Sequence, residues 1–292
     1  TQRFLGYLAV LVAPTFARDL DQACEALAAR VLRAPWARAG AAAALIVALP
    51  LPSTLTGAFR PGIAIRWEFF PVAACDWIEA HDVRGHGMNP FAWGGYLLWR
   101  FWPQPGRLPF MDIHQAGTTQ DRYAYALAPV DTAAWYWLDR ERRFDWVLEQ
   151  RKSTDPRDHL LDMLDRDSTW ALVFTDDVAA LYVRRRGSLA ALAQRERYHW
   201  LAAGEDALGG IGARAYADTS AERAIRAELE RQVRDSPWNG DANSLLANLD
   251  LHDGEWSGAL AHLEAARRAS PHLAGLQARE QIARDSLAAQ KR

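Results

Sequence analysis

The chain lacks the features that would place it in several common classes of protein. Its 292 residues include only two cysteines, Cys24 and Cys75, and its formal net charge is −2. Two cysteines do not build a disulfide-stapled fold, and a near-neutral chain offers no polybasic surface, so we expect no nucleic-acid partner. The sequence contains no Walker loop, no GxGxxG after a strand, no HExxH and no GxSxG. We therefore predict no cofactor and no metal site.

Charge is also missing from two long stretches near the start of the sequence. Residues 39–59 carry no charged side chain between Arg38 and Arg60, and a helix that crosses the hydrocarbon core of a membrane needs about 20 such residues. The alternative is a buried, alanine-rich core helix, which Pro50 and Pro52 would end early. Residues 4–17 are apolar as well. We expect residues 1–59 to be a membrane-associated segment, and this chain to be the C-terminal part of a larger polytopic protein.

The stretch between the two apolar runs predicts the topology. Residues 18–38 include four arginines, and short loops rich in arginine face the cytoplasm. Apolar side chains recur every three to four residues over 20–32, which favours an amphipathic helix that contacts membrane lipid or packs on the rest of the protein. Residues after Phe59 would then lie on the extracytoplasmic side of a bacterial cytoplasmic membrane. Cys24 and Cys75 would lie on opposite sides and would not pair.

Strand and helix patterns alternate over residues 60–204, which we expect to form an extracytoplasmic domain. The expected strands are 63–70, 108–114, 144–150, 170–174 and 178–184, and the expected helices are 71–80, 90–102 with Asn89 as its cap, 122–139 and 159–164. Asp176 and Asp177 fit the turn between the last two strands, because aspartate side chains bind turn amides; a carboxylate pair for a cation is the alternative. The pattern predicts a small α/β sandwich with a mainly parallel sheet and a terminal antiparallel hairpin.

Tryptophan is abundant, with thirteen residues in the chain. Indole rings fill hydrophobic cores, and they also line sugar-binding or membrane-facing surfaces. We expect core packing to be their main use.

The order of five segments in this region resembles a known family. The segments are WIEAH, NPFAWGGYLLWRFWP, FMDIH, FDWVLEQR and WALVFTDDVAALYVRR. In this order they resemble the soluble domain that follows the last transmembrane helix in bacterial polytopic proteins related to GT-C-type glycosyltransferases, the relatives of protein mannosyltransferases and oligosaccharyltransferases. The resemblance covers residues 4–204. It implies a polyprenyl-phosphate sugar as donor and a catalytic carboxylate on an early extracytoplasmic loop that this chain does not contain.

Four residues, Trp93, Gly94, Gly95 and Tyr96, are similar to the WWDYG signature with which oligosaccharyltransferases hold an acceptor peptide. Glycine stands here where that signature has aspartate, so the acidic side chain is missing. The resemblance makes these residues candidates for substrate binding. From the residues alone, adjacent glycines let another backbone approach closely or expose amides to a ligand, so close packing of this helix on the sheet is the alternative.

Asp112 and His114 lie at the end of an expected strand. Residues separated by one position share a face of a strand, so a carboxylate and an imidazole could meet one ligand there as an acid/base or metal pair. The alternative is a structural pair joined by a hydrogen bond. We include both residues among the candidates for substrate binding, and no catalytic residue can be assigned.

From about residue 216 onward the chain becomes charged, alanine-rich and helical, and we expect residues 205–292 to form a tetratricopeptide-like helical domain. Residues 243–271 contain Leu246, Ala247, Gly254, Ala259 and Pro271, and closely resemble one tetratricopeptide repeat. Residues 221–237 and 273–287 would supply a helix before it and a helix after it. Such repeats bind peptides or partner proteins, and a stabilising cap is the alternative.

Two functions are consistent with these patterns. In the first, the whole protein is a membrane glycosyltransferase, specifically a hexosyltransferase, and this segment helps to position the acceptor or to gate the site. In the second, the chain is a non-enzymatic membrane scaffold whose helical repeats recruit a protein partner during cell-envelope assembly.

Overall fold

The computed structural model describes residues 69–112, 117–153 and 155–290 without gaps, together with isolated positions between residues 12 and 44. The chain divides into two compact units, residues 1–65 and residues 66–292. The apolar runs 4–17 and 39–59 and the expected amphipathic helix 20–32 lie almost wholly outside the described residues. None of the helices within the described residues has the length and apolar character needed to cross a membrane.

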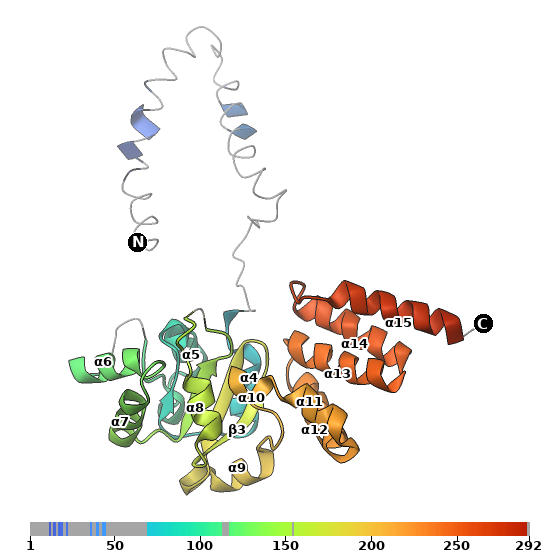
Figure 1. Ribbon diagram of the computed structural model, residues 1–292. Coiled ribbons are helices and arrows are strands. Elements are labelled where there is room, and N and C mark those ends of the chain that lie inside the picture. Colours follow the sequence, from blue (N-terminus) through green and yellow to red (C-terminus); the bar gives the residue numbers. More distant parts are fainter. Residues whose placement is uncertain are drawn as a thin grey trace. The chain divides into compact units, whose positions relative to one another are not determined.

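The second unit is mostly helical and contains a small mixed sheet (Figure 1). Its first part consists of α4 (Val72–Ala80), β1 (Gly87–Met88), η2 (Phe91–Trp93), α5 (Gly94–Phe101), η3 (Pro105–Arg107), α6 (Thr119–Leu127), α7 (Thr132–Arg142), β2 (Trp146–Gln150), α8 (Leu160–Arg166), β3 (Trp170–Thr175), β4 (Ala179–Arg184), η4 (Gly187–Leu189) and α9 (Ala190–Glu196). The helical tail consists of α10 (Glu205–Leu208), α11 (Ile211–Ala217), α12 (Thr219–Asp235), α13 (Gly240–Asp253), α14 (Trp256–Ala269) and α15 (Leu276–Gln290).

The sheet has the order β1-β2-β4-β3, and the expectation of a mainly parallel sheet is wrong for the described strands. Only β1 and β2 run parallel there, with Gly87 opposite Trp146. Strand β4 pairs with β2 and with β3 in antiparallel registers, because the β3–β4 hairpin turns its second strand into the middle of the sheet. The hairpin itself is confirmed. The sheet therefore consists of one antiparallel hairpin extended by β2 and by a two-residue edge strand.

Helices cover both faces of this sheet (Figure 1). Trp146 and Leu148 of β2 pack into a core with side chains of α4, α5 and α9. Val147, between them, packs into a second core with side chains of α6, α7 and α8. This alternation follows from the two-residue period of a strand. Trp135, Trp146 and Trp170 are among the largest fully buried side chains, so the expectation of core packing is confirmed for these three.

Two expected elements differ from the structure for local chemical reasons. The expected helix 122–139 is two helices, because Pro129 interrupts it and Asp131 caps the second with bonds from the amides of Ala133 and Ala134. Residues 108–112 of the expected strand 108–114 form a loop. Residues 63–68 of the expected strand 63–70 lie outside the described residues, and Phe69 and Phe70 are not in a strand.

The turn between β3 and β4 holds both of its aspartates, as expected, and also reaches the helical tail. One carboxylate oxygen of Asp176 accepts bonds from the amides of Val178 at 2.8 Å and Ala179 at 2.7 Å. The carboxylate of Asp177 accepts bonds from the Gly240 amide at 2.7 Å and from the Ser270 hydroxyl at 2.7 Å. Gly240 is the first residue of α13. A turn residue of the sheet thus satisfies the free amides and the positive dipole end of a tail helix.

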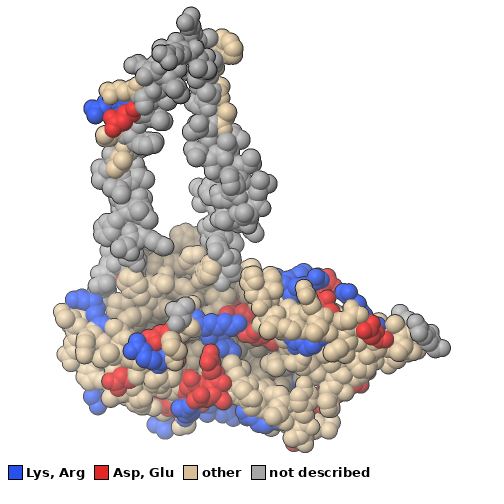
Figure 2. Space-filling model, turned by 45° about the horizontal axis from the view of Figure 1, so that its top comes forward, with Lys and Arg blue, Asp and Glu red and all other residues tan. Residues whose placement is uncertain are grey.

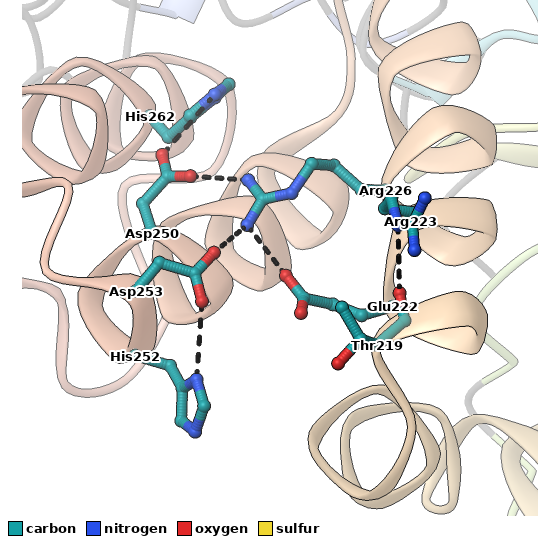
Figure 3. Close-up of polar contacts among 8 residues, drawn as sticks. All are labelled: Thr219, Glu222, Arg223, Arg226, Asp250, His252, Asp253 and His262. Atoms are coloured by element: carbon teal, nitrogen blue, oxygen red, sulfur yellow. Dashed lines mark hydrogen bonds and ion pairs between the residues drawn. The ribbon is translucent and has the colours of Figure 1, made fainter.

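The tail contains the two helices expected for the repeat at 243–271, as α13 and α14, with α12 before them and α15 after them. A network of charges joins the first three of these helices (Figure 3). The guanidinium of Arg226 on α12 donates to Asp250 at 2.5 Å, to Asp253 at 2.7 Å and to Glu222 at 3.1 Å. His262 of α14 lies 3.8 Å from the carboxylate of Asp250. This network fixes α12 and α14 against α13.

Candidate functional site

The structure gives Trp93 and Tyr96 roles in packing. Trp93 is buried, and its indole Nε1 donates to the carbonyl oxygen of Phe69 at 2.9 Å. Tyr96 is also buried and contacts Phe70, with ring centroids 5.1 Å apart. Among the described residues its hydroxyl has no hydrogen-bond partner, and burial raises the pKa of Tyr96 to about 12. Both side chains are therefore part of the core around α5, and their role in substrate binding stays a prediction.

The two glycines of the motif differ sharply from each other. A methyl group added at Gly94 would lie 2.2 Å from the carbonyl oxygen of Met111 and 2.5 Å from the Cα of Asp112. The glycine is therefore required for close packing, although the partner is the 108–112 loop and not the sheet. A methyl group added at Gly95 would meet no atom within 4 Å. Gly95 alone among the four motif residues is exposed.

The buried side chain of Asn89 explains why the 108–112 segment is a loop. Its amide nitrogen donates to the carbonyl oxygens of Pro90 at 2.9 Å and Met111 at 2.8 Å. Its carbonyl oxygen accepts from the amides of Phe110 at 2.8 Å and Met111 at 3.3 Å. The expectation that Asn89 caps the following helix is wrong, because the cap position is Pro90 and receives no side-chain bond. The side chain of Asn89 thus forms hydrogen bonds with backbone groups that would pair with a neighbouring strand if this segment were in a sheet.

Asp112 lies beside Gly94, at the end of this loop. His114 lies outside the described residues. The proposed pairing of the two side chains therefore stays a prediction. The close approach of Gly94 to Asp112 does bring two of the sequence-predicted candidates together at the start of α5.

A cleft of about 340 Å³ lies beside the 105–110 loop. Its lining combines backbone, proline rings, aromatic rings and three polar side chains, and consists of Gly85, His86, Gly87, Pro105, Leu108, Pro109, Phe110, Glu141, Arg142 and Phe144. Clefts that hold small ligands have volumes of about 300–1,000 Å³ and a mainly apolar lining with few polar groups. No sequence motif predicted this cleft, because its residues come from three segments far apart in the chain.

Glycine shapes the wall of the cleft that precedes β1. Gly85 adopts a φ of 122°, a conformation that side chains disfavour. A methyl group at Gly87 would lie 2.0 Å from the indole of Trp146. Between them, the His86 amide donates to the carboxylate of Asp145 at 2.8 Å and leaves the imidazole exposed at the rim. The 85–87 segment therefore lines the cleft mainly with backbone atoms and contributes one side chain, the imidazole of His86.

The remaining lining of the cleft is mainly aromatic and charged. Phe110 meets Phe144 edge to face, with ring centroids 5.0 Å apart. Arg142 is oriented by Asp121, whose carboxylate accepts from its Nε at 2.8 Å and also from its Nη2. This bond is the main reason why the pKa of the buried Asp121 is lowered to about 2. The guanidinium of Arg142 is partly exposed at the rim next to the exposed Glu141, and the carboxylate of Asp121 balances its charge.

A second group with altered acidity lies at the far end of β2. Burial raises the pKa of Glu149 to about 8, and Asp158 adds to this effect. Burial likewise raises the pKa of Tyr125, whose hydroxyl accepts from the amide of Phe91 at 2.6 Å and donates to the carbonyl oxygen of Asn89 at 3.0 Å. The sequence signal for this site was an acid within an apolar strand, and we overlooked it. Tyr125 thus links α6 to the turn at Asn89.

The arrangement is suited to binding. Across the ranges 69–112, 117–153 and 155–290, no group of three His, Cys, Asp or Glu side chains could hold a metal ion. The surface charges do not form an extended field of one sign on the face that Figure 2 shows, because acidic and basic side chains are interspersed there. Aromatic rings and a polar rim suit the apolar faces and the hydroxyl groups of a sugar or glycan.

Comparisons with protein families, with curated proteins and with solved structures found no match to this chain.

Proposed function

We propose that the chain is the non-catalytic C-terminal part of a membrane glycosyltransferase-type protein that uses a polyprenyl-phosphate sugar, and that the cleft between Phe110 and His86 positions the acceptor. Support comes first from the segment order that resembles this superfamily. In the structure these segments pack on one another: Asn89 binds the 108–112 loop, and β2 pairs with β4. They therefore form one platform.

The observation that carries the proposal is the composition of the cleft. Phe110 presents aromatic surface and is backed by the buried Phe144, and His86, Glu141 and Arg142 present polar groups at the rim. A pyranose offers one apolar face and a ring of hydroxyls, which match these two kinds of wall. The cleft holds no nucleophile paired with a base, so positioning is the role its residues support.

Deletion of the whole gene tests the glycosyltransferase part of this proposal. We expect altered cell-envelope glycans together with an accumulated pool of lipid-linked sugar, because the donor would no longer be consumed. Both are measured by mass spectrometry of the envelope and of extracted lipids. Unchanged glycans and unchanged pools would sink the proposal.

Two cleft side chains test the role of this chain in the complete protein. The double substitution His86→Ala and Glu141→Ala should raise KM for the acceptor about tenfold and leave kcat unchanged, as expected when about 1.4 kcal/mol of uniform binding energy is lost. The matched control is His272→Ala with Glu230→Ala, which removes the same two residue types at exposed positions in the tail. Equal KM values for the two double variants would contradict a role for the cleft.

A specific observation in the tail favours the scaffold as a second candidate function. A cavity of about 140 Å³ lies between α11, α12 and α13 and is lined mainly by aliphatic side chains, with Tyr216 and Asn248 as its polar members. Arg279 of α15 reaches Ser244 at 2.9 Å and Asn248 at 2.7 Å, and burial lowers its pKa. In the described part of the chain, it forms no ion pair with a carboxylate.

This combination suits a peptide with an aliphatic side chain and an acidic group, because the cavity takes the first and Arg279 the second. A deletion strain with normal glycans and normal lipid-linked sugars, but with a disturbed envelope-assembly complex, would favour the scaffold over the enzyme. Arg279→Ala should then reproduce the disturbance, and Arg284→Ala, on the same helix, should not.

A further inference from the structure

Helix α5 and the residue that follows it carry exposed tryptophans, and α5 lies near the start of the continuously described chain at Phe69 (Figure 1). Trp99 and Trp102 are each 68% exposed, and Phe69 is 55% exposed. Five of the other tryptophans in this unit, including Trp77 and Trp93, are buried. We call Phe69, Trp99 and Trp102 the aromatic strip.

The strip is continuous with packed aromatic residues beneath it. Phe70 follows Phe69 and contacts Tyr96, and Tyr96 contacts Trp99 with ring centroids 5.7 Å apart. Trp102 follows Trp99 by three residues, which is close to one turn of a helix. The strip therefore runs from the start of the described chain along α5 to its end, over a rigid base.

The outward side of α5 departs from the pattern of a surface helix. Such a helix directs apolar side chains to the core and charged ones to water. Arg100 carries the one charge of α5, and its guanidinium donates to Asp76 and to Glu79, each at 2.5 Å. The hydrogen bond to Glu79 is the main reason why the pKa of Arg100 is raised. The strip is thus apolar and aromatic, beside a charge that is already neutralised.

We propose that the aromatic strip docks on the lipid surface of the membrane from which residues 39–59 emerge. This inference rests on the proposed membrane anchor. Phe69 follows Phe59 by ten positions, and an extended chain spans at most about 3.6 Å per residue, so the connection allows Phe69, the first residue of the strip, to be at most roughly 36 Å from the end of the apolar run. Tryptophan is the side chain that favours the headgroup level of a membrane, because its ring is apolar and its N–H can still bond.

Other exposed aromatic residues of the unit lack these features. Tyr123, Tyr136 and Tyr216 are exposed singly on α6, α7 and α11, and each carries a hydroxyl. Tyr123 is 69% exposed, as much as the two tryptophans. It therefore provides a matched control position for a probe of the surroundings.

The test uses the full-length chain in vesicles of phosphatidylcholine and phosphatidylglycerol. Cys24→Ser and Cys75→Ala remove the native thiols, and a single cysteine at position 99, 102 or 123 carries a nitroxide. Electron paramagnetic resonance then measures collisions with oxygen, which concentrates in lipid, and with a nickel chelate, which stays in water. We expect the ratio of oxygen to nickel collisions at 99 and 102 to exceed the ratio at 123 severalfold. The three native side chains are exposed, so these variants should fold.

Each outcome decides a different point. Equal ratios at all three positions in a chain that remains with the vesicles would overturn the docking of the strip and leave the membrane anchor intact. Loss of the chain from the vesicles would contradict the anchor and, with it, both proposals. A water-like ratio at 99 and 102, with immobilisation of the nitroxides on addition of a soluble oligosaccharide, would make the strip a sugar platform and overturn its docking on lipid.

Discussion

The sheet-containing part and the helical tail of this protein achieve burial in different ways. The largest fully buried side chains, among them Trp135, Trp146, Trp170 and Tyr182, all belong to the first part. The buried apolar side chains of the tail are mostly alanines and leucines, and its helices are joined by the charges around Arg226 (Figure 3). The stability gained by burying large aromatic rings is not screened by salt, whereas the stability gained from ion pairs depends on salt and pH. We therefore expect the two regions to fail under different conditions.

The largest effect should come from removing a ring from the sheet core. Trp146→Ala should lower the free energy of unfolding by about 4 kcal/mol, because it opens a large cavity beneath the sheet. Trp99→Ala, at an exposed position, should change it by less than about 0.5 kcal/mol. Urea-dependent proteolysis of the full-length protein measures both. Similar losses for the two variants would show that burial of the ring is not what stabilises this region.

A matched pair of glycine substitutions should have the next largest effect. Gly94→Ala should cost about 3 kcal/mol, because the added methyl group collides with the backbone of the 108–112 loop. Gly95→Ala should be neutral or stabilise the protein by up to about 1 kcal/mol, because it meets no atom and alanine favours a helix. The same proteolysis assay compares the two. A loss at position 95 as large as at 94 would contradict the contact geometry.

The β3–β4 turn, which contacts the helical tail, should make the free energy of unfolding depend on pH. Burial raises the pKa of Asp176 to about 6 in the folded protein, above its ordinary value. The resulting stability is fully present at low pH and is lost as pH rises through about 6, so this group should lower the free energy of unfolding by about 2 kcal/mol between pH 4 and pH 6. Asp121 acts in the opposite direction, because its lowered pKa gives stability that is lost only as pH falls toward about 2.

Urea unfolding at several pH values checks this sign. Asp176→Asn should remove the decline between pH 4 and pH 6 and preserve the acceptor for the amides of Val178 and Ala179. A decline of the same size in the variant would assign it to other groups.

The smallest effect should come from the ionic network of the tail. Arg226→Ala should cost about 1–2 kcal/mol, because it leaves the buried Asp250 without its strongest partner, although the guanidinium is partly in water. Arg268→Ala, which breaks an exposed pair with Glu264, should cost less than about 0.5 kcal/mol. Hydrogen exchange of α12 and α13 at low and high salt measures the difference. An Arg226 variant that matches the Arg268 variant at every salt concentration would show that the network adds nothing.

Local sequence patterns predicted much of the secondary structure. The β3–β4 hairpin, β2, α4 and the α13–α14 pair were predictable, because the period of their apolar residues and their turn residues are encoded in adjacent positions. The pairing of β2 with β4 was not predictable, because the neighbour of a strand in a sheet is set by contacts between segments far apart in the chain. The 108–112 segment was assigned to a strand because its residue types suit one. Its backbone groups are used instead by Asn89, about twenty residues earlier in the chain.

The candidate binding residues stay a prediction, and the structure describes only how they pack. Trp93, Gly94 and Tyr96 were found by their resemblance to a binding signature, and the structure uses all three for packing. The cleft was missed because no short motif marks it: His86, Phe110 and Glu141 are brought together only when three loops meet. A binding surface that forms only when distant segments come together cannot be predicted from local patterns in a single sequence.

The carboxylate of Asp177 has a consequence for how this protein can be divided or recombined. It belongs to the sheet, yet it provides bonds at the start of α13 and to Ser270, at the end of α14. If the tail were exchanged for an unrelated pair of helices, the carboxylate of Asp177 would lose its hydrogen-bond donors. The first turn of the new helix would also lack an acceptor for its free amides. The tail is therefore not an interchangeable module, and natural or engineered fusions that preserve folding should carry the hairpin and the tail together.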